Sequence, residues 1–505
     1  MKVLLINIPF LFQNRYEATL WHCLGLLQIA SYLRKHHHDV AILDSFREGY
    51  HNINDYHGLC RIGLPNSDII KRIPEDTQLI GVSVPFSHFA VLAHELIESI
   101  KTHYPQIPLV LGGIYPSSQP ESAVMSKADF VVLGEGEEPM LHLVNALSDG
   151  TSVEWPSVIK SKEDLNMSRS YFMKDLSKLP LPARDLVDFS KYVELSPRGS
   201  KGKRSASIVT SRGCPYDCGF CSIHPVSGYN WRAFSSQQVI KEINHLVDTY
   251  NINNLEIEDD NFTHDPVRAE EILNGIIEIN KTKGYLSWHA QNGVRIDTLN
   301  ENLVKLFKES NAQLVNLALE HGDEEMLKII GKKLNLKKVE EVVRWYAKYG
   351  ISGYLFMICG YPGETRKRHK KALKFYRKMY KIAPQLLPGV FYAQPYPNTK
   401  LYKLCVEKQY IDSDKIFDLH SHTRFSTENM VWIETKDFDK KEVVKRKDEI
   451  LRIFKNYYEK NIKPPHRTRK MLQQLRNLLG HTSWLIGQQM QKTVPGLYTF
   501  LKKYL

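Results

Sequence analysis

The sequence predicts an α/β protein with two parallel-sheet domains, an open doubly wound sheet followed by a partial (β/α)6 barrel, and then a mainly helical C-terminal region. Apolar, β-rich runs alternate with segments of helical spacing over residues 1–150, and the alternation resumes at residue 205. Beyond residue 402 the periodicity is mainly helical. We therefore expect domains at 1–150 and 205–402, a linker at 151–204, and a helical region with a basic tail at 403–505.

The expected strands place polar or small residues at their carboxyl ends. In the first domain the strands are Val3–Ile8, Val40–Leu43, Leu79–Val84, Leu109–Leu111 and Phe130–Leu133. In the second they are Ser207–Ser211, Leu255–Asp260, Leu286–Asn292, Leu314–Glu320, Tyr354–Cys359 and Phe391–Gln394. A Ser235-Ser236 cap signal predicts a helix over 239–250. Because parallel sheets bind ligands beyond the carboxyl ends of their strands, we expect the functional groups there.

Composition excludes several classes of protein. With 505 residues, 42% hydrophobic and 25% charged, the chain is a packed globular protein and not a disordered or fibrous one. It has no apolar run of about 18 residues and no export signal in its opening stretch, which predicts a cytoplasmic protein. The net charge of +12 owes much to residues 463–505, which carry eight Lys/Arg and no Asp or Glu. This tail is either a contact for anionic lipid or nucleic acid, or a solvated helical surface.

The sharpest motif is a C-x3-C-x2-C array formed by Cys214, Cys218 and Cys221, directly after the first strand of the second domain. Three thiolates on one loop can hold three irons of a four-iron, four-sulfur (4Fe–4S) cluster, and no fourth cysteine lies nearby. One iron would therefore stay open to an exchangeable ligand. One alternative is a structural zinc site with His224 as the fourth ligand. The other is that the three cysteines are core residues without a ligand. The remaining cysteines are scattered singly and read as buried thiols; they are Cys23, Cys60, Cys359 and Cys405.

This array, with Phe220 before its last cysteine, resembles the signature of the radical S-adenosylmethionine (SAM) superfamily. The likeness continues over about residues 205–402, through LEIEDDNF at 255–262, LALEHG at 317–322, YLFMICGYPGET at 354–365 and YPNTKLY at 396–402. It implies a cluster whose open iron binds SAM and whose electron cleaves SAM to a 5′-deoxyadenosyl radical. The residues that it assigns to SAM are Glu320, Asp260, Glu258 and Arg295.

An α/β domain before such a barrel resembles the cobalamin-binding branch of the superfamily, in which a flavodoxin-like (Rossmann-type) domain holds the corrin over its strand ends. Asp44, Phe46 and Gly49 resemble a D-x-H-x-x-G pattern in which Phe46 replaces the histidine. The resemblance then implies cobalamin without a lower histidine ligand, which favours methyl transfer. The remaining residues that it assigns to cobalamin are Ser83, Phe86, Gly112, Gly113 and Gly134. The alternative is a flavodoxin-like domain that binds nothing. The three histidines at 36–38 follow a predicted helix, and we expect them to be exposed to solvent rather than to bind a metal.

These resemblances predict a cobalamin-dependent radical SAM enzyme that methylates an unactivated carbon, with an electron donor such as flavodoxin or ferredoxin. The alternatives are a radical cyclase, oxidase or ring-rearranging enzyme with the same cofactors, an RNA-modifying radical SAM enzyme, and a non-enzymatic iron–sulfur module. The basic segment is a tail rather than a patch with interleaved aromatics, which disfavours nucleic acid as a partner. The substrate is a small molecule or a lipid. Leucines and Trp484 between the basic residues of the tail are compatible with a peripheral membrane contact.

Overall fold

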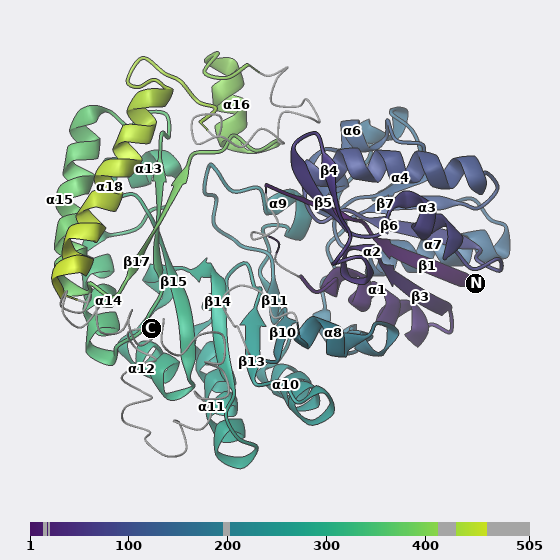
Figure 1. Cartoon of the computed structure of the whole chain (residues 1–505), viewed down its shortest axis with the longest axis horizontal. Coiled ribbons are helices and arrows are strands. Elements are labelled where there is room, and N and C mark those ends of the chain that lie inside the picture. Colours follow the sequence, from purple (N-terminus) through teal and green to yellow (C-terminus); the bar gives the residue numbers. More distant parts are fainter. Residues whose placement is uncertain (14–17, 19–20, 195–202, 413–430, 462–505) are drawn as a thin grey trace, which may run out of the picture.

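Two six-stranded sheets organise the molecule (Figure 1), as seen in the computed structural model, which describes residues 1–13, 18, 21–194, 203–412 and 431–461. The first is a mainly parallel open sheet and the second is a parallel, partly closed barrel wall. The predicted fold class is confirmed. Within the described residues, no helix combines the length and the apolar character that a bilayer-spanning helix needs.

The first sheet has the strand order β3-β1-β6-β7-β8-β9, in which only β9 runs antiparallel. Its strands are β1 (Lys2–Asn7), β3 (Asp39–Asp44), β6 (Leu79–Ser83), β7 (Leu109–Gly112), β8 (Phe130–Val132) and β9 (Val158–Ile159). Both faces are covered. Leu5 packs in one apolar cluster with residues of α1 (Leu24–Lys35) and α7 (Glu137–Asp149). Leu4 packs in another with residues of α3 (Asn66–Lys71) and α4 (Ala90–His103). The strand after β1 in the sheet, β3, lies on one side of β1, whereas β6 and the later strands lie on its other side. The connections of the sheet therefore diverge between β1 and β6.

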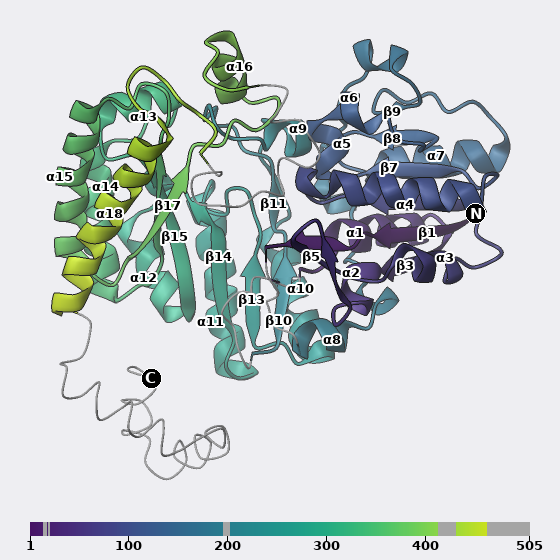
Figure 2. The ribbon, with the colours of Figure 1, turned by 45° about the horizontal axis from the view of Figure 1, so that its top comes forward.

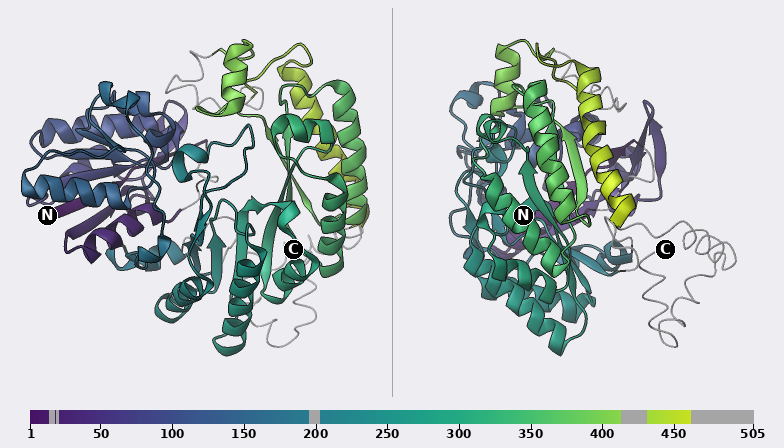
Figure 3. Two further views of the ribbon diagram at one scale, coloured as in Figure 1. Left: turned by 180° about the vertical axis from the view of Figure 1, so that it is seen from behind. Right: turned by 90° about the vertical axis from the view of Figure 1, so that its left-hand side faces the viewer.

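The second sheet has the order β10-β13-β14-β15-β16-β17. The strands are β10 (Ser205–Ile208), β13 (Asn254–Ile257), β14 (Ser287–Val294), β15 (Ala312–Glu320), β16 (Tyr354–Cys359) and β17 (Leu387–Tyr392). The helices that follow them are α10 (Ser236–Tyr250), α11 (Pro266–Thr282), α12 (Glu301–Glu309), α13 (Glu324–Ile330), α14 (Leu336–Tyr349), α15 (Arg366–Ile382) and α16 (Lys400–Glu407). The last described helix, α18 (Lys440–Asn461), packs on α15 and β17, on the side of the barrel away from the first domain (Figure 3).

The predicted cap of α10 is confirmed, because the Ser235 side chain accepts a hydrogen bond from the Gln238 N–H and the Gln238 side-chain oxygen accepts one from the Ser235 N–H. The expected strand Ser207–Ser211 is divided. It ends at Ile208, and the N–H of Thr210 donates to Asp259 instead of continuing the ladder. Residues 211–212 (β11) then pair with 232–233 (β12).

The sequence did not reveal a small antiparallel sheet within the first domain, formed by β2 (Phe10–Phe12), β4 (Ile53–Tyr56) and β5 (Leu59–Ile62). The remaining short helices are α2 (Ser45–Glu48), α5 (Ile114–Ser118), α6 (Pro120–Ala123), α8 (Phe189–Glu194) and α9 (His224–Ser227).

The predicted linker, residues 151–204, packs on the first domain through the part that the structure describes. Its residues 158–159 form β9, and Gln28 and Ser31 of α1 donate hydrogen bonds to the carbonyls of Pro180 and Leu181, at 2.9 and 2.5 Å. The first domain lies beside the β10 end of the barrel wall (Figure 2). The strand ends of the open sheet and the loop after β10 therefore come together.

Candidate functional site

The three cysteines lie on the loop that follows β11, and each is half-buried. The loop starts at Gly213, whose N–H donates to Asp260 Oδ2 at 3.0 Å. Gly213 has a φ of +83°, and a Cβ there would lie 2.4 Å from the carbonyl oxygen of Asn230, so only glycine fits this turn. Asp260, three residues after the end of β13, thus fixes where the cysteine loop begins.

Three later segments support the middle of the loop at Gly219. Its N–H donates to the carbonyl of Ile330, and its carbonyl accepts from the N–H of Leu401, both at 2.8 Å. A Cβ at Gly219 would lie 2.6 Å from the hydroxyl oxygen of Tyr361. The loop between Cys218 and Cys221 is therefore held by residues that follow β15, β16 and β17.

Burial raises the pKa of the Cys214 and Cys218 thiols, and it raises that of Cys221 to about 12. The positive charges of Lys332 and Arg295 act in the opposite direction on Cys214 and Cys218. Two cations beside buried thiols favour thiolates, and a thiolate is the form that binds iron. The positive charge is therefore placed where an iron–sulfur cluster would need it.

Among the described residues, no three His, Cys, Asp or Glu side chains are grouped so that they could hold one metal ion. A 4Fe–4S cluster does not require that convergence, because each thiolate binds a different iron. His224, the proposed fourth ligand of a zinc site, instead has its Nε2 3.2 Å from the Cys214 carbonyl and its ring stacked on Tyr229. The donor set fits a cluster better than it fits zinc.

Glu320 ends β15 in a left-handed conformation, with a φ of +70°. Such a conformation is costly for a non-glycine residue, and it concentrates at functional sites. Its Oε1 accepts a hydrogen bond from Lys332 Nζ at 3.0 Å, and both side chains are buried. Burial lowers the pKa of Lys332, but the charge of Glu320, its hydrogen bond with Lys332 and the nearby Cys218 together raise this pKa above its ordinary value. The sequence did not single out Lys332, because its partner lies twelve residues earlier across a helix and a turn.

Arg295 lies between this pair and the cysteine loop. Its guanidinium stacks over the Tyr216 ring at 3.5 Å and donates to the Lys332 carbonyl at 2.8 Å. Glu320, Lys332 and Arg295 thus form one charged group beside Cys214 and Cys218.

A cavity of about 500 Å³ lies between the two domains. Four predicted residues from the strand ends of the first domain line it, namely Ser83, Gly112, Gly113 and Gly134. The barrel contributes Ser211, Arg212, Glu258 and Asp260, and the linker contributes residues 179–182. Burial raises the pKa of Asp260 to about 6, although the Gly213 N–H acts in the opposite direction. Its neighbour Asp259 is instead structural, since it accepts bonds from Thr210 and Ser211 at 2.6 Å.

The other four predicted cobalamin residues are not among those that line this cavity. Asp44 ends β3, and Phe46 and Gly49 follow it, on the far side of β1 from β6 and β7. Phe46 is fully buried and stacks on Phe10 with ring centroids 4.2 Å apart. Asp44 accepts bonds from Asn7, at 2.8 Å, and from Tyr192.

Gly49 is required by the turn itself, because a Cβ there would lie 2.1 Å from the Leu64 nitrogen. Phe86 packs near Trp21, with ring centroids 5.7 Å apart.

A group of buried ion pairs that the sequence did not predict joins the two domains. We call it the domain clamp; it consists of Glu135, Glu137, Arg212 and Arg232. Both carboxylate oxygens of Glu135 accept bonds from Arg232, each at 2.8 Å, and Glu137 accepts one from Arg212 at 2.7 Å. Arg212 directly precedes the turn into the cysteine loop. The two glutamates that flank Gly136 and the arginine before the cysteine array are the signals in the sequence that could have pointed to the clamp.

Comparison with known proteins agrees with this geometry. The family model for the radical SAM superfamily matches residues 208–376, and the model for the B12 binding domain matches residues 18–144. Cytidylyl-2-hydroxyethylphosphonate methyltransferase of Streptomyces wedmorensis is 28% identical over 458 residues, covering 82% of this chain and 83% of its own.

An anaerobic magnesium-protoporphyrin IX monomethyl ester cyclase of Synechocystis is 24% identical over 426 residues, covering 82% of this chain and 79% of its own. Among solved structures, the radical SAM methyltransferase TsrM of Kitasatospora setae, with cobalamin and a 4Fe–4S cluster bound, superimposes with a TM-score of 0.62 at 19% identity. That match covers 80% of this chain and 74% of TsrM, and it shows a shared fold.

Proposed function

Because the chain combines a B12-binding domain with a radical SAM domain, it belongs to the cobalamin-binding radical SAM proteins, and we propose that it methylates an unactivated carbon of a small molecule. One observation carries the proposal. A single cavity is lined both by the strand ends of the first domain and by Asp260, the residue that anchors the start of the cysteine loop. A methyl carrier in this cavity would therefore face the radical source.

When bound, the cluster and SAM supply the electron and the radical that open a C–H bond, and cobalamin supplies the methyl carrier. The chain's own groups hold and orient these cofactors. Cys214, Cys218 and Cys221 would each hold one iron. The Glu320–Lys332 pair, Arg295, Asp260 and Glu258 offer the charged groups that an amino-acid ligand such as the methionine part of SAM needs.

The first domain would hold cobalamin by shape more than by charge. Gly112 leaves open space where a side chain would begin, and the cavity extends to Leu5, Gly81 and Val110 beneath α1 and α7. No histidine is among the residues that line the cavity in the described part of the chain. Because Phe46 is buried in the core, this lining would offer no imidazole to a bound cobalamin.

Anaerobic reconstitution with iron, sulfide and hydroxocobalamin, followed by reaction with SAM and dithionite, tests this function. We expect about four irons and one cobalt per chain, with 5′-deoxyadenosine and S-adenosylhomocysteine as products. Iron without cobalt would reduce the assignment to a corrin-free radical SAM enzyme.

The second candidate is a cobalamin-dependent cyclase or ring-rearranging enzyme, which the likeness to the Synechocystis cyclase favours. The same assay separates the two, because methyl transfer consumes a second SAM and yields S-adenosylhomocysteine. A reaction that yields 5′-deoxyadenosine without S-adenosylhomocysteine would identify the second candidate.

A bulky side chain at Gly112 tests the cavity. We expect Gly112→Phe to weaken cobalamin binding at least about tenfold, by analogy with other substitutions that disturb a cofactor site, because its ring would enter the cavity. Gly112→Ala is the matched control, since its Cβ meets no atom within 4 Å. The measurement is titration of hydroxocobalamin by visible absorbance, with urea unfolding to compare stabilities. Equal affinity in both variants would place cobalamin elsewhere.

A lipid substrate and a peripheral membrane contact were predicted from the basic tail at 463–505. This tail lies outside the described residues, so both stay predictions. We propose liposome co-sedimentation with anionic and neutral vesicles as the test, in which binding to neither vesicle would reject the membrane contact.

A further inference from the structure

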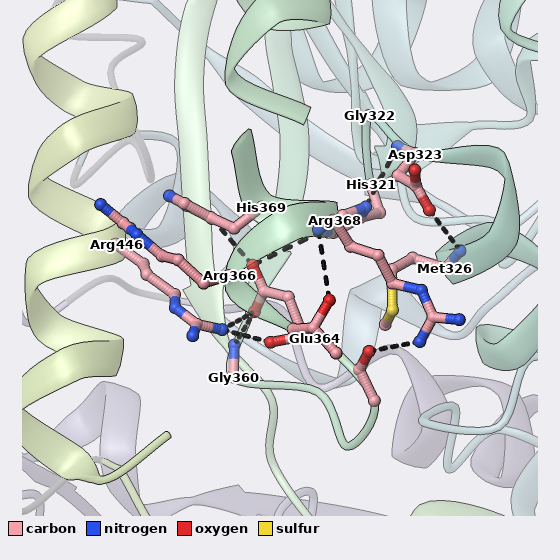
Figure 4. Close-up of polar contacts among 12 residues, drawn as sticks. His321, Gly322, Asp323, Met326, Gly360, Glu364, Arg366, Arg368, His369 and Arg446 are labelled. Carbon is pink, nitrogen blue, oxygen red and sulfur yellow. Dashed lines mark hydrogen bonds and ion pairs between the residues drawn. The ribbon is translucent and has the colours of Figure 1, made fainter. Parts of the chain in front are cut away.

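A group of polar and charged side chains lies where the loops after β15 and β16 meet α18, and Figure 4 labels its four buried members. We call it the Glu364 cluster; it consists of His321, Glu364, His369, Arg446 and Glu449. Glu364, which is 1% exposed, ends the G-x-P-G-E loop at 360–364. Its Oε2 accepts the Gly360 N–H at 2.7 Å, and its Oε1 lies 2.9 Å from His369 Nδ1 and 3.5 Å from His321 Nε2. One carboxylate thus joins two strand ends and the first turns of α15.

Helix α18 brings the remaining charges. Arg446 is fully buried, donates to the Glu364 carbonyl, and has its Nη1 3.7 Å from Glu364 Oε2. Glu449 Oε2 lies 3.1 Å from His369 Nε2, and Glu449 also forms a two-point ion pair with Arg366 at 2.6 and 2.9 Å. Both ring nitrogens of His369 therefore face carboxylates, and the ring can donate to both only as imidazolium.

The cluster touches the proposed SAM site on two sides. On one side His321 directly follows Glu320. On the other, Gly360 precedes Tyr361, whose hydroxyl meets Gly219 of the cysteine loop. Gly360 has a φ of +77°, and a Cβ there would lie 2.9 Å from Val443 of α18, so this helix packs directly on the loop.

We propose that Arg446 and Glu449 of α18 are positioning residues for SAM. They act through Glu364 and His369. These two residues hold the 360–365 loop, which keeps Tyr361 against Gly219 of the cysteine loop, and they contact His321, which directly follows Glu320. This inference rests on the proposed function. It assigns a role to a helix that lies outside the residues matched by the radical SAM model, which end at 376.

The free energy of unfolding at acid pH should depend on the ionisation of Glu364 in this cluster. Burial raises the pKa of Glu364, but its bonds to His321 and His369 outweigh this and lower the pKa from 4.5 to about 2. A lowered carboxyl pKa stabilises the fold above pH 4.5, and this contribution is lost as the pH falls toward 2. The groups that face Glu364 are His321 directly after β15, His369 on α15 and Arg446 on α18.

We therefore expect the difference in free energy of unfolding between wild type and Glu364→Gln to shrink as the pH falls below 4.5. Urea unfolding at a series of pH values measures it. Asp448→Asn, at an exposed site on α18, is the control and should show no such convergence. A constant difference for Glu364→Gln would contradict the lowered pKa.

SAM binding tests the positioning role. The reconstituted holoprotein is titrated with SAM while the electron paramagnetic resonance spectrum of the reduced cluster is recorded. We expect Arg446→Gln to keep its iron and cobalt but to bind SAM at least about tenfold more weakly, the usual scale for a group behind a ligand. Arg446→Lys should restore part of the affinity. Arg452→Gln, an exposed arginine on the same helix, should match wild type.

Unchanged SAM affinity in Arg446→Gln would overturn the inference and leave the proposed function intact. If the wild-type spectrum does not respond to SAM, the proposed function and the inference fail together. Should Arg446→Gln fail to load iron, Glu449→Gln replaces it, because it leaves the contacts between Arg446 and Glu364 in place. Its SAM affinity should fall in the same direction, and an affinity equal to that of wild type would overturn the inference.

Discussion

A Cys218→Ala protein should fold normally, lose its iron–sulfur cluster, and cleave SAM at least about a thousandfold more slowly than wild type, as expected when an essential member of a unit is removed. Only three thiols lie on the loop, so two would remain. The other cysteines of the described chain lie elsewhere, and Cys359 and Cys405 are fully buried. None can replace the missing thiolate.

Iron analysis, the spectrum of the reduced cluster and thermal unfolding measure this result. Cys60→Ala, a half-buried cysteine on β5 in the first domain, is the control and should keep its iron and its activity. A full complement of four irons in Cys218→Ala would show that the array does not hold the cluster.

Removal of the Glu135 carboxylate from the domain clamp should cost about 3–5 kcal/mol of stability, the range for breaking a buried ion pair. The side chains of Glu135 and Arg232 are 7% and 10% exposed. Glu135→Ala would leave the Arg232 charge without its carboxylate, with the carbonyls of Met173 and Ser227 as its remaining acceptors. The Met173 N–H would also lose its acceptor. Because Arg212 of the clamp directly precedes Gly213, cobalamin and iron contents should fall together.

Urea unfolding of Glu135→Ala, Arg232→Ala and the double variant measures the coupling between the two side chains. Glu121→Gln, at an exposed site on α6, is the control for loss of a negative charge. Additive effects of the two alanine substitutions would mean that the pair does not stabilise the domain contact.

Much of the fold could be predicted from the sequence because its signals are local. Val3–Ile8 and the other apolar runs of the first domain form strands within one or two residues of the expected bounds. The helix after Ser235 begins as its cap predicts. The β4–β5 hairpin escaped notice because its strands are short and partly exposed, and its turn uses a positive φ at both His57 and Gly58.

The contacts within the candidate site are less visible in the sequence. The cysteine array and Glu320 belong to short motifs, but Lys332 and Arg446 contribute through partners that only the fold brings near. Glu135 and Arg232 are 97 residues apart, and Glu364 and Arg446 are 82 apart. No periodicity reports such pairs. Phe46 illustrates the converse, since it occupies the position of the histidine in the D-x-H-x-x-G pattern while its side chain packs into the core.

The support of Gly219 by Ile330, Tyr361 and Leu401 has a consequence for biogenesis. Leu401 is made about 180 residues after Cys221, so at usual rates of synthesis the thiols leave the ribosome roughly 10 to 40 seconds before their last support. The nascent loop would meet oxidants and stray metals without its scaffold during that interval. We therefore expect assembly factors to deliver iron and sulfide after the chain is released, and a fragment that stops before residue 400 to be a poor acceptor.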